Sequence, residues 1–382
     1  MVISGFCDLG FERVREEFER NFSERGDVGA CLTLAGETVV DLWAGVADAN
    51  TGAPWQADTV GLVFSTTKGA TALCAHVLVS RGLLDLDAPV ARYWPEFAQA
   101  GKAGIPVRML LNHQVGLPAL RGPLPRGAFY NWDHMTAALA AEEPFWEPGT
   151  RHAYHWYTFG WLVGEVVRRV AGKSLGTFFS AEVAGPLGLD FWISLPEEME
   201  PRVALMIMGG RPAGLDPAGI PGLVWYNDGG YLDAGECNAR AAHAAEVPAI
   251  NGITNARGLA GMYAPLACGG SLRGVRLVDG DSLGRMSAVV SASGKDGILD
   301  MPTRYSLGFQ KFGPANPLAV AEEGLGHAGM GGSVGFADTK ARLSFGYMMN
   351  EHGTHERAAR LVDAVYLSLG YTSKASGAWI KG

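Results

Sequence analysis

The chain has 382 residues, of which 48% are hydrophobic and 10% aromatic, so it is long enough to bury one large core or two interlocked ones. Its formal net charge of −8 argues against nucleic-acid binding, because phosphate affinity requires clustered Lys and Arg and no basic run occurs. No stretch approaches the roughly 20 apolar residues of a membrane span. We therefore expect a globular protein with small neutral or apolar ligands and no nucleic-acid or membrane partner.

Five cysteines are scattered through the chain, an odd number without a Cys-x-x-Cys pair, which argues against zinc and redox sites. The first 20 residues soon become charged and lack the apolar core of a signal peptide. We expect reduced thiols in a cytoplasmic protein.

The histidines suggest no metal centre either. No His-Glu-x-x-His motif occurs, and neither His152 with His155 nor His352 with His355 has a third ligand suggested by spacing. We expect no metal and no other cofactor, surface positions for His152, His155 and the adjacent Arg151, and exposed helix-start positions for His352 and His355.

The first part of the chain alternates between helix and strand patterns. Apolar residues at helical spacing predict an amphipathic helix over residues 10–21. Two β-rich runs, 28–34 and 38–45, flank a three-residue turn and predict a hairpin. Residues 65–81 are helical again and rich in Ala and Leu, and Gly82 follows as a stop signal.

The rest of the chain divides into a helical middle and a β-rich end. Residues 83–248 alternate short helical patterns with loops rich in Pro, Gly and aromatic residues, which indicates an inserted helical domain. Alternating patterns predict strands over 303–312, 331–338 and 342–349, and residues 355–369 form a closing helix. The two ends of the chain would then share one antiparallel sheet with helices on its faces.

Ser65 and Lys68 form the first candidate for chemistry. They lie three residues apart at the start of the predicted helix, so their side chains share one face and can meet. A serine is a weak nucleophile until a neighbouring base takes its proton, and a lysine is such a base when burial depresses its pKa. This Ser-x-x-Lys motif, between a β-rich segment and a Gly- and Ala-rich helix, resembles that of serine β-lactamases and penicillin-binding proteins.

A second segment resembles the Pro-Gly-Thr run of class C β-lactamases and related esterases. It begins at Pro148, and Tyr154 falls on the tyrosine of the Tyr-x-Asn motif that follows. The resemblance implies that the Tyr154 phenol acts as a base towards Ser65 and then as an acid towards the leaving group; a core tyrosine is the structural alternative. Trp156 replaces the asparagine that in the family helps to hold the amide side chain of a β-lactam.

A third segment, Gly326 to Met330, resembles the Lys-Thr-Gly strand of the β-lactamases, with His327 at the lysine position. Gly329 would let the strand approach the substrate closely. The resemblance implies an oxyanion hole formed by the backbone N–H groups of Ser65 and Met330. Loss of the cationic lysine removes a partner for the carboxylate of penicillins, which favours neutral esters.

Weaker similarities to the family occur at residues 105–117 and 251–260. Together, all matched segments run from about residue 65 to residue 332. Aromatic residues gather in the helical middle of the chain. We expect them, Phe129 and Trp156 among them, to form partly the core and partly an apolar wall of the substrate pocket.

Ser333 offers a competing assignment, because it lies in a Gly-x-Ser-x-Gly sequence like the nucleophile elbow of α/β-hydrolases. That fold requires a long helix directly after the serine, whereas a strand end and a turn follow here. Ser65 is therefore the better candidate.

Together the motifs resemble the serine β-lactamase and penicillin-binding-protein superfamily, and within it the class C β-lactamase-like carboxylesterases of family VIII. The resemblance implies an α+β, transpeptidase-like fold: an antiparallel sheet flanked by helices, built from residues 1–64 and 249–382, with a mostly helical domain at 65–248 and the active site between them. It implies hydrolysis of small, short-chain neutral carboxylic esters through an acyl-enzyme on Ser65. A β-lactamase, a D-amino-acid peptidase or amidase, an acyltransferase and a non-catalytic sensor remain the alternatives.

Overall fold

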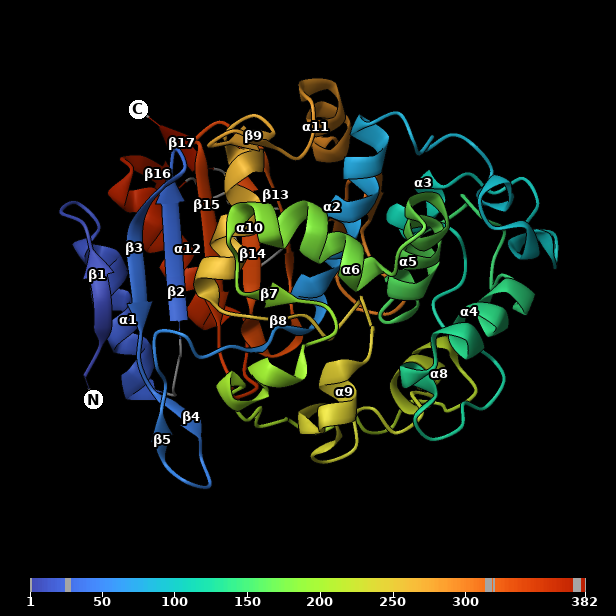
Figure 1. The fold of residues 1–382 in the computed structure, drawn as a ribbon, viewed down its shortest axis with the longest axis horizontal. Helices are drawn as coiled ribbons and strands as arrows, with labels where there is room; N and C mark the ends of the chain where they lie inside the picture. The colour runs from blue at the N-terminus through green and yellow to red at the C-terminus, as the bar shows by residue number, and fades with distance from the viewer. Residues whose placement is uncertain (1, 25–28, 313–317, 319, 374–378, 382) are drawn as a thin grey trace.

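A computed structural model describes residues 2–24, 29–312, 318, 320–373 and 379–381. A large sheet lies on one side of the molecule, together with both ends of the chain, and the helical middle segment lies on the other (Figure 1). In the part of the chain that the structure describes, no helix is both long and apolar enough to cross a membrane.

The two ends of the chain share one six-stranded sheet, as the sequence predicts. All neighbouring strands are antiparallel. In spatial order the strands are β1 (Ser4–Cys7), β3 (Glu37–Trp43), β2 (Gly29–Leu34), β15 (Leu343–Met348), β14 (Val334–Asp338) and β13 (Gly324–Ala328).

The predicted hairpin joins β2 and β3. Ala35 and Gly36 both adopt positive φ, 51° and 87°, which is the backbone of a tight hairpin turn. Residue 28, where the first strand was expected to begin, lies outside the described residues.

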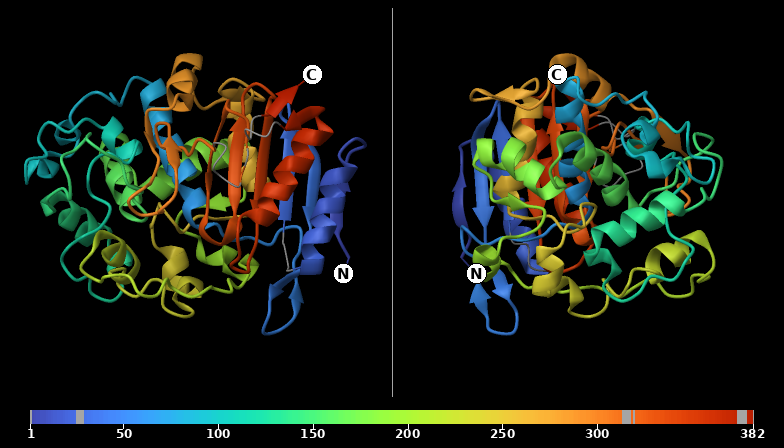
Figure 2. Two further views of the ribbon diagram at one scale, coloured as in Figure 1. Left: turned by 180° about the vertical axis from the view of Figure 1, so that it is seen from behind. Right: turned by 45° about the vertical axis from the view of Figure 1, so that its right-hand side comes forward.

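Helices cover both faces of the sheet. On one face lies α10 (Ala256–Ala267) (Figure 1), and a side chain at Gly346 would meet its backbone, 2.3 Å from the Ala256 oxygen. The other face packs against α1 (Glu12–Glu24) and α12 (Glu356–Ser368), seen from behind in Figure 2. The predicted helices over 10–21 and 355–369 are confirmed with small shifts of their ends.

One predicted strand is wrong. Residues 303–312 form strand only at β12 (Thr303–Tyr305), which pairs with β11 (Ser291–Ser293). The chain then bends at Gly308, whose φ is 93°, and Gln310 makes isolated bridges to Tyr305 and Gly326. Several residues of this segment line a cavity instead of forming one continuous strand, so the alternation of apolar and polar residues was misread as a strand pattern.

The predicted helix over residues 65–81 is present as a short 3₁₀ turn, Phe64–Thr66, followed by α2 (Thr67–Ser80), and Gly82 ends it at φ 70°. Most of α2 is buried. The other helices of the middle segment are α3 (Arg108–Leu111), α4 (Trp132–Ala141), α5 (Thr158–Ala171), α6 (Leu175–Phe179), α7 (Gly185–Leu187), α8 (Ile220–Tyr226) and α9 (Arg240–Ala244).

A second, three-stranded sheet links the middle segment to both of its neighbours. It joins β6 (Gly61–Leu62), β8 (Ile253–Thr254) and β7 (Phe191–Trp192). The domain boundaries expected at 64/65 and 248/249 stay a prediction. The remaining elements are β4 (Val46–Asp48), β5 (Ala53–Pro54), β9 (Ser271–Leu272), β10 (Val275–Arg276), α11 (Gly280–Ser287), β16 (Tyr371–Ser373) and β17 (Trp379–Lys381).

Candidate active site

Ser65 is held at the start of α2 by an unusual backbone. The preceding residue, Phe64, is fully buried and has φ 45°, a left-handed conformation that is strained for a bulky side chain. Ser65 lies in the same 3₁₀ turn and lines a cavity of about 560 Å³. The strained turn therefore directs the hydroxyl into the cavity at the N-terminal end of a helix.

Lys68 lies one turn further on, with no exposed surface. Its Nζ is 3.0 Å from Ser65 Oγ, 2.5 Å from the Trp156 carbonyl oxygen and 3.1 Å from the Ala249 carbonyl oxygen. Burial alone holds the pKa of this amine well below its usual range, and no carboxylate of the described residues opposes the effect. Lys68 is therefore suited to act as a neutral amine beside the hydroxyl.

Tyr154 completes the group. Its ring centre lies 4.8 Å from Lys68 Nζ, and its side chain lines the same cavity as Ser65. Burial raises the pKa of Tyr154, the nearby Ser65 hydroxyl acts against this, and the charge of Asp296 raises it further. At neutral pH the group is therefore a phenol that can donate a proton. The structure thus brings the three predicted catalytic residues together.

The cavity in front of Ser65 has mostly apolar walls. Trp156 lines it, as the sequence predicts, and packs against Trp225 of α8 with ring centres 5.3 Å apart. Trp225 could not be predicted from the sequence, because nothing in the local pattern separates it from other aromatic residues. The wall formed by residues 292–294, 299 and 301–305 was not predicted either.

The segment after β13 shows why a glycine is needed beside the nucleophile. A side chain at Gly329 would lie 2.3 Å from the Val63 oxygen and 2.1 Å from Ser333 Oγ. The Gly329 N–H donates to the Ser333 carbonyl at 2.7 Å, so it is not free for substrate. Met330, the next residue along the chain, lines the cavity, where the sequence predicts that its N–H contributes to an oxyanion hole.

His355 is the clearest departure from an expected exposed position. It lines the cavity, and its Nε2 lies 3.0 Å from the Gly329 carbonyl oxygen. A carbonyl only accepts, so Nε2 carries the proton. This bond fixes the peptide unit that contains the Met330 N–H.

Two predicted substrate-binding residues do not reach the cavity wall. His327 is 1% exposed, its Nδ1 donates to the Ala328 carbonyl at 2.7 Å, and its ring centre lies 6.0 Å from that of Tyr154. Burial lowers the pKa of His327 to about 3, so it is neutral at pH 7. Phe129 is also 1% exposed and packs against Tyr157 and Trp161.

The residues after Pro148 include two further corrections. Arg151 is exposed, as expected, but His152 and His155 are buried. His155 Nδ1 donates to the Ala153 carbonyl at 2.8 Å, and Nε2 accepts the Leu117 N–H at 3.0 Å. Because both ring nitrogens are occupied, the role of His155 is structural.

Ser333 has no access to the cavity. It is fully buried, its hydroxyl donates to the Val63 carbonyl at 2.8 Å, and it lies 3.0 Å from Thr66 Oγ1. Its hydrogen bonds hold the start of β14 against the turn that carries Ser65.

Lys68→Met should stabilise the protein at neutral pH while abolishing activity. Because the folded-state pKa of Lys68 is depressed, the unfolded chain binds more protons than the folded one between that pKa and the ordinary lysine value of about 10.4. Wild-type stability should therefore rise with pH across that window relative to the variant. Thermal unfolding of both proteins at pH 7 and pH 10 measures this, and a gap between them that stays constant would contradict a depressed pKa.

Comparisons with known proteins agree with this geometry. The beta-lactamase family model matches residues 16–368. The chain is 36% identical over 363 residues to the esterase/beta-lactamase LipL of Mycobacterium tuberculosis, covering 91% of this chain and 83% of that protein. Among solved structures, a family VIII carboxylesterase shares 41% identity at a TM-score of 0.85, and a penicillin-binding protein homologue from Caulobacter crescentus shares 35% at 0.88; each match covers 96% of this chain and 100% of the other. The chain therefore belongs to the beta-lactamase family and is an enzyme of the serine hydrolase type.

Proposed function

We propose that this enzyme is a carboxylesterase that hydrolyses small, short-chain neutral carboxylic esters through an acyl-enzyme on Ser65. The observation that carries the proposal is the contact of Ser65 Oγ with the buried amine of Lys68 at the edge of a mostly apolar cavity. The esterase name of LipL and the similarity to a family VIII carboxylesterase support it.

The hydrogen bonds of Lys68 suggest how acylation begins. A neutral amine has two N–H donors and one lone pair, and the carbonyls of Trp156 and Ala249 can only accept. When both N–H groups donate to them, the lone pair faces Ser65 Oγ. Lys68 then takes the hydroxyl proton as Ser65 attacks the ester carbonyl.

The remaining protons pass through the Lys68 and Tyr154 pair. As the tetrahedral intermediate collapses, the bond to the alcohol breaks and the Tyr154 phenol protonates the leaving oxygen. The proton held by Lys68 restores the phenol, and the two groups titrate as a unit. In deacylation a water gives its proton to this pair and attacks the acyl carbon, and Ser65 leaves with the proton. The Ser65 and Met330 N–H groups would stabilise both oxyanions.

The surroundings of Ser65 favour a neutral ester over a β-lactam. Trp156 occupies the position of the amide-binding asparagine, and His327 is neutral and buried. Arg304 and Lys311 also line the cavity, but the first is paired with the Glu322 carboxylate and the second donates to the Glu322 carbonyl. Arg304 is therefore neutralised by an ion pair, and Lys311 is buried, with one of its N–H groups occupied by that carbonyl.

With p-nitrophenyl acetate or butyrate, the enzyme should show a burst of nitrophenol equal to the enzyme concentration, followed by slower turnover. Ser65→Ala should lose both phases. Ser333→Ala serves as the matched control: it leaves a buried carbonyl without its donor and should lose about 1–3 kcal/mol of stability, yet keep the burst. If Ser65→Ala stayed active while Ser333→Ala did not, the nucleophile would be misassigned.

The same assay separates ester from lactam hydrolysis. We expect kcat/KM for p-nitrophenyl butyrate to exceed that for nitrocefin by about 100-fold or more, because a site that lacks a substrate group's hydrogen-bond partner discriminates strongly. Nitrocefin turnover as fast as ester turnover would identify a β-lactamase instead.

A further inference from the structure

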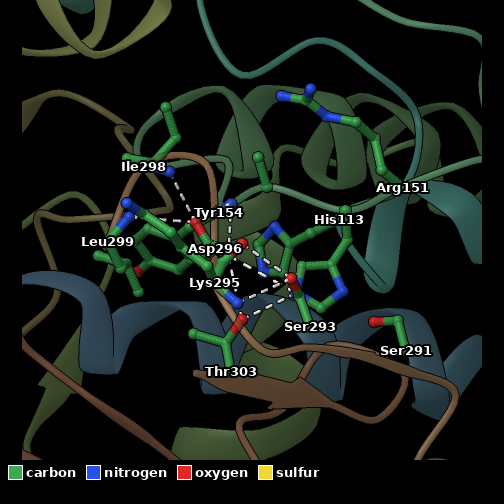
Figure 3. Close-up of polar contacts among 12 residues, drawn as sticks. His113, Arg151, Tyr154, Ser291, Ser293, Lys295, Asp296, Ile298, Leu299 and Thr303 are labelled. Atoms are coloured by element: carbon green, nitrogen blue, oxygen red, sulfur yellow. Dashed lines mark hydrogen bonds and ion pairs between the residues drawn. The ribbon is translucent and has the colours of Figure 1, made fainter. Parts of the chain in front are cut away.

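Asp296 is a fully buried carboxylate next to the active site that the proposed reaction leaves unused. Figure 3 shows it at the centre of a set of polar contacts. Both of its oxygens lie 3.1 Å from the Tyr154 N–H nitrogen. It also accepts hydrogen bonds from the N–H groups of Ile298 (2.8 Å) and Leu299 (3.1 Å), and from the hydroxyl of Thr303 (3.1 Å).

These donors come from two distant parts of the chain. Tyr154 belongs to the middle segment, whereas Ile298 and Leu299 lie in the loop between β11 and β12 and Thr303 begins β12. The loop and the start of β12 form one wall of the cavity through Leu299, Met301 and Thr303. A single carboxylate therefore ties the backbone of the catalytic phenol to the wall that contacts the substrate.

The charge of Asp296 is balanced by dipoles rather than by a cation. No Lys or Arg of the described residues forms an ion pair with it, and its only basic neighbour is His152, whose Nε2 is 3.6 Å away. His152 Nε2 lies 2.8 Å from Thr303 Oγ1. Since the Thr303 hydroxyl donates to Asp296, its oxygen accepts from His152 Nε2–H, and burial lowers the pKa of the imidazole against the opposing charge of Asp296. Burying a carboxylate without a cation is costly, and here the hydrogen bonds from Tyr154, Ile298, Leu299 and Thr303 offset that cost.

Asp296 is also the only carboxylate acting on Tyr154 among the described residues. The other titratable groups that face the phenol are Lys68, His113, Tyr305 and His327. Burial lowers the pKa of both histidines and raises that of Tyr305, so these three are neutral at pH 7. The Asp296 charge is thus the one negative charge that opposes ionisation of the phenol.

We propose that Asp296 is a positioning residue for ester hydrolysis: it fixes Tyr154 beside Lys68 and Ser65 and holds the substrate-binding wall in register with it. The inference rests on the proposed esterase function. It gives the cluster in Figure 3 a role beyond closing a loop.

Asp296→Asn tests this role, because the amide keeps the shape but removes the charge and turns one acceptor into a donor. Its kcat for p-nitrophenyl butyrate should fall about 10- to 100-fold, since misplacement of a catalytic group by a fraction of an ångström has effects of this size. The alkaline limb of its kcat profile should move to lower pH, because loss of the negative charge lowers the pKa of Tyr154. KM should change less than kcat.

Asp300→Asn is the matched control. Asp300 lies in the same loop, but its side chain is 78% exposed and pairs only with Lys295 among the described residues, at 2.8 Å. It should keep wild-type kcat and an unchanged pH profile. If Asp296→Asn had the wild-type kcat and an unchanged alkaline limb, the proposal would be overturned. A lower melting temperature alone would not rescue it, because a purely structural role also predicts lower stability with unchanged kinetics.

If Asp296→Asn does not fold, comparison of Thr303→Val with Thr303→Ser tests the positioning role of Asp296. Valine removes the hydroxyl that donates to Asp296, whereas serine keeps it, so kcat should fall about tenfold in the first and largely recover in the second. Equal rates in the two would contradict the proposal. Failure of the esterase function itself looks different, because the wild type would then hydrolyse nitrocefin as fast as p-nitrophenyl butyrate.

Discussion

The active site depends on the exclusion of water from one amine, that of Lys68. Lys68 lies in the interior of the protein, where its amine contacts two backbone carbonyls and the Ser65 hydroxyl and no carboxylate of the described residues. An ammonium in such a place is costly, so its pKa falls and the neutral base becomes available at ordinary pH. A nearby carboxylate would pair with the ammonium and remove that advantage. The other buried groups around it are neutral histidines and tyrosines, which preserve the condition.

Close packing around α2 is what excludes water from the amine. Gly69, directly after Lys68, leaves room for Tyr263, whose hydroxyl would lie 2.1 Å from a side chain there. Gly252 does the same opposite Thr67, at 2.6 Å from Oγ1, and the Gly252 N–H donates to that oxygen at 2.8 Å. Short side chains thus let the two segments that carry Tyr263 and Gly252 pack against the first turn of the helix, where the Ala249 carbonyl contacts the amine.

The sequence predicts those parts of the fold and site that depend on local geometry. Ser65 and Lys68 meet because residues three apart share a helix face, and the shared sheet follows from period-two patterns at both ends of the chain. Tyr154 could be found only because its motif stands in the expected order. Each of these predictions uses information carried by neighbouring residues or by a known motif.

The parts that the sequence did not predict are created by contacts between distant segments. Trp225, Asp296 and His355 reach the site from three regions that no pattern connects, since a lone Trp, Asp or His is more often structural. The same limit explains the errors. His155 was expected at the surface from its residue type, yet both of its nitrogens find backbone partners inside the protein, and the alternation over 303–312 reflected a cavity wall rather than a strand.

The most direct test of the account is the pH dependence of covalent labelling of Ser65 by a p-nitrophenyl alkylphosphonate, which needs only the nucleophile and its base. Mass spectrometry identifies the labelled residue, and stopped-flow release of nitrophenol gives the rate. The account predicts a single label on Ser65 and a rate that reaches its plateau at a pH well below the ordinary lysine pKa of about 10.4. A rate that keeps rising to pH 10, or a label on another serine, would contradict it.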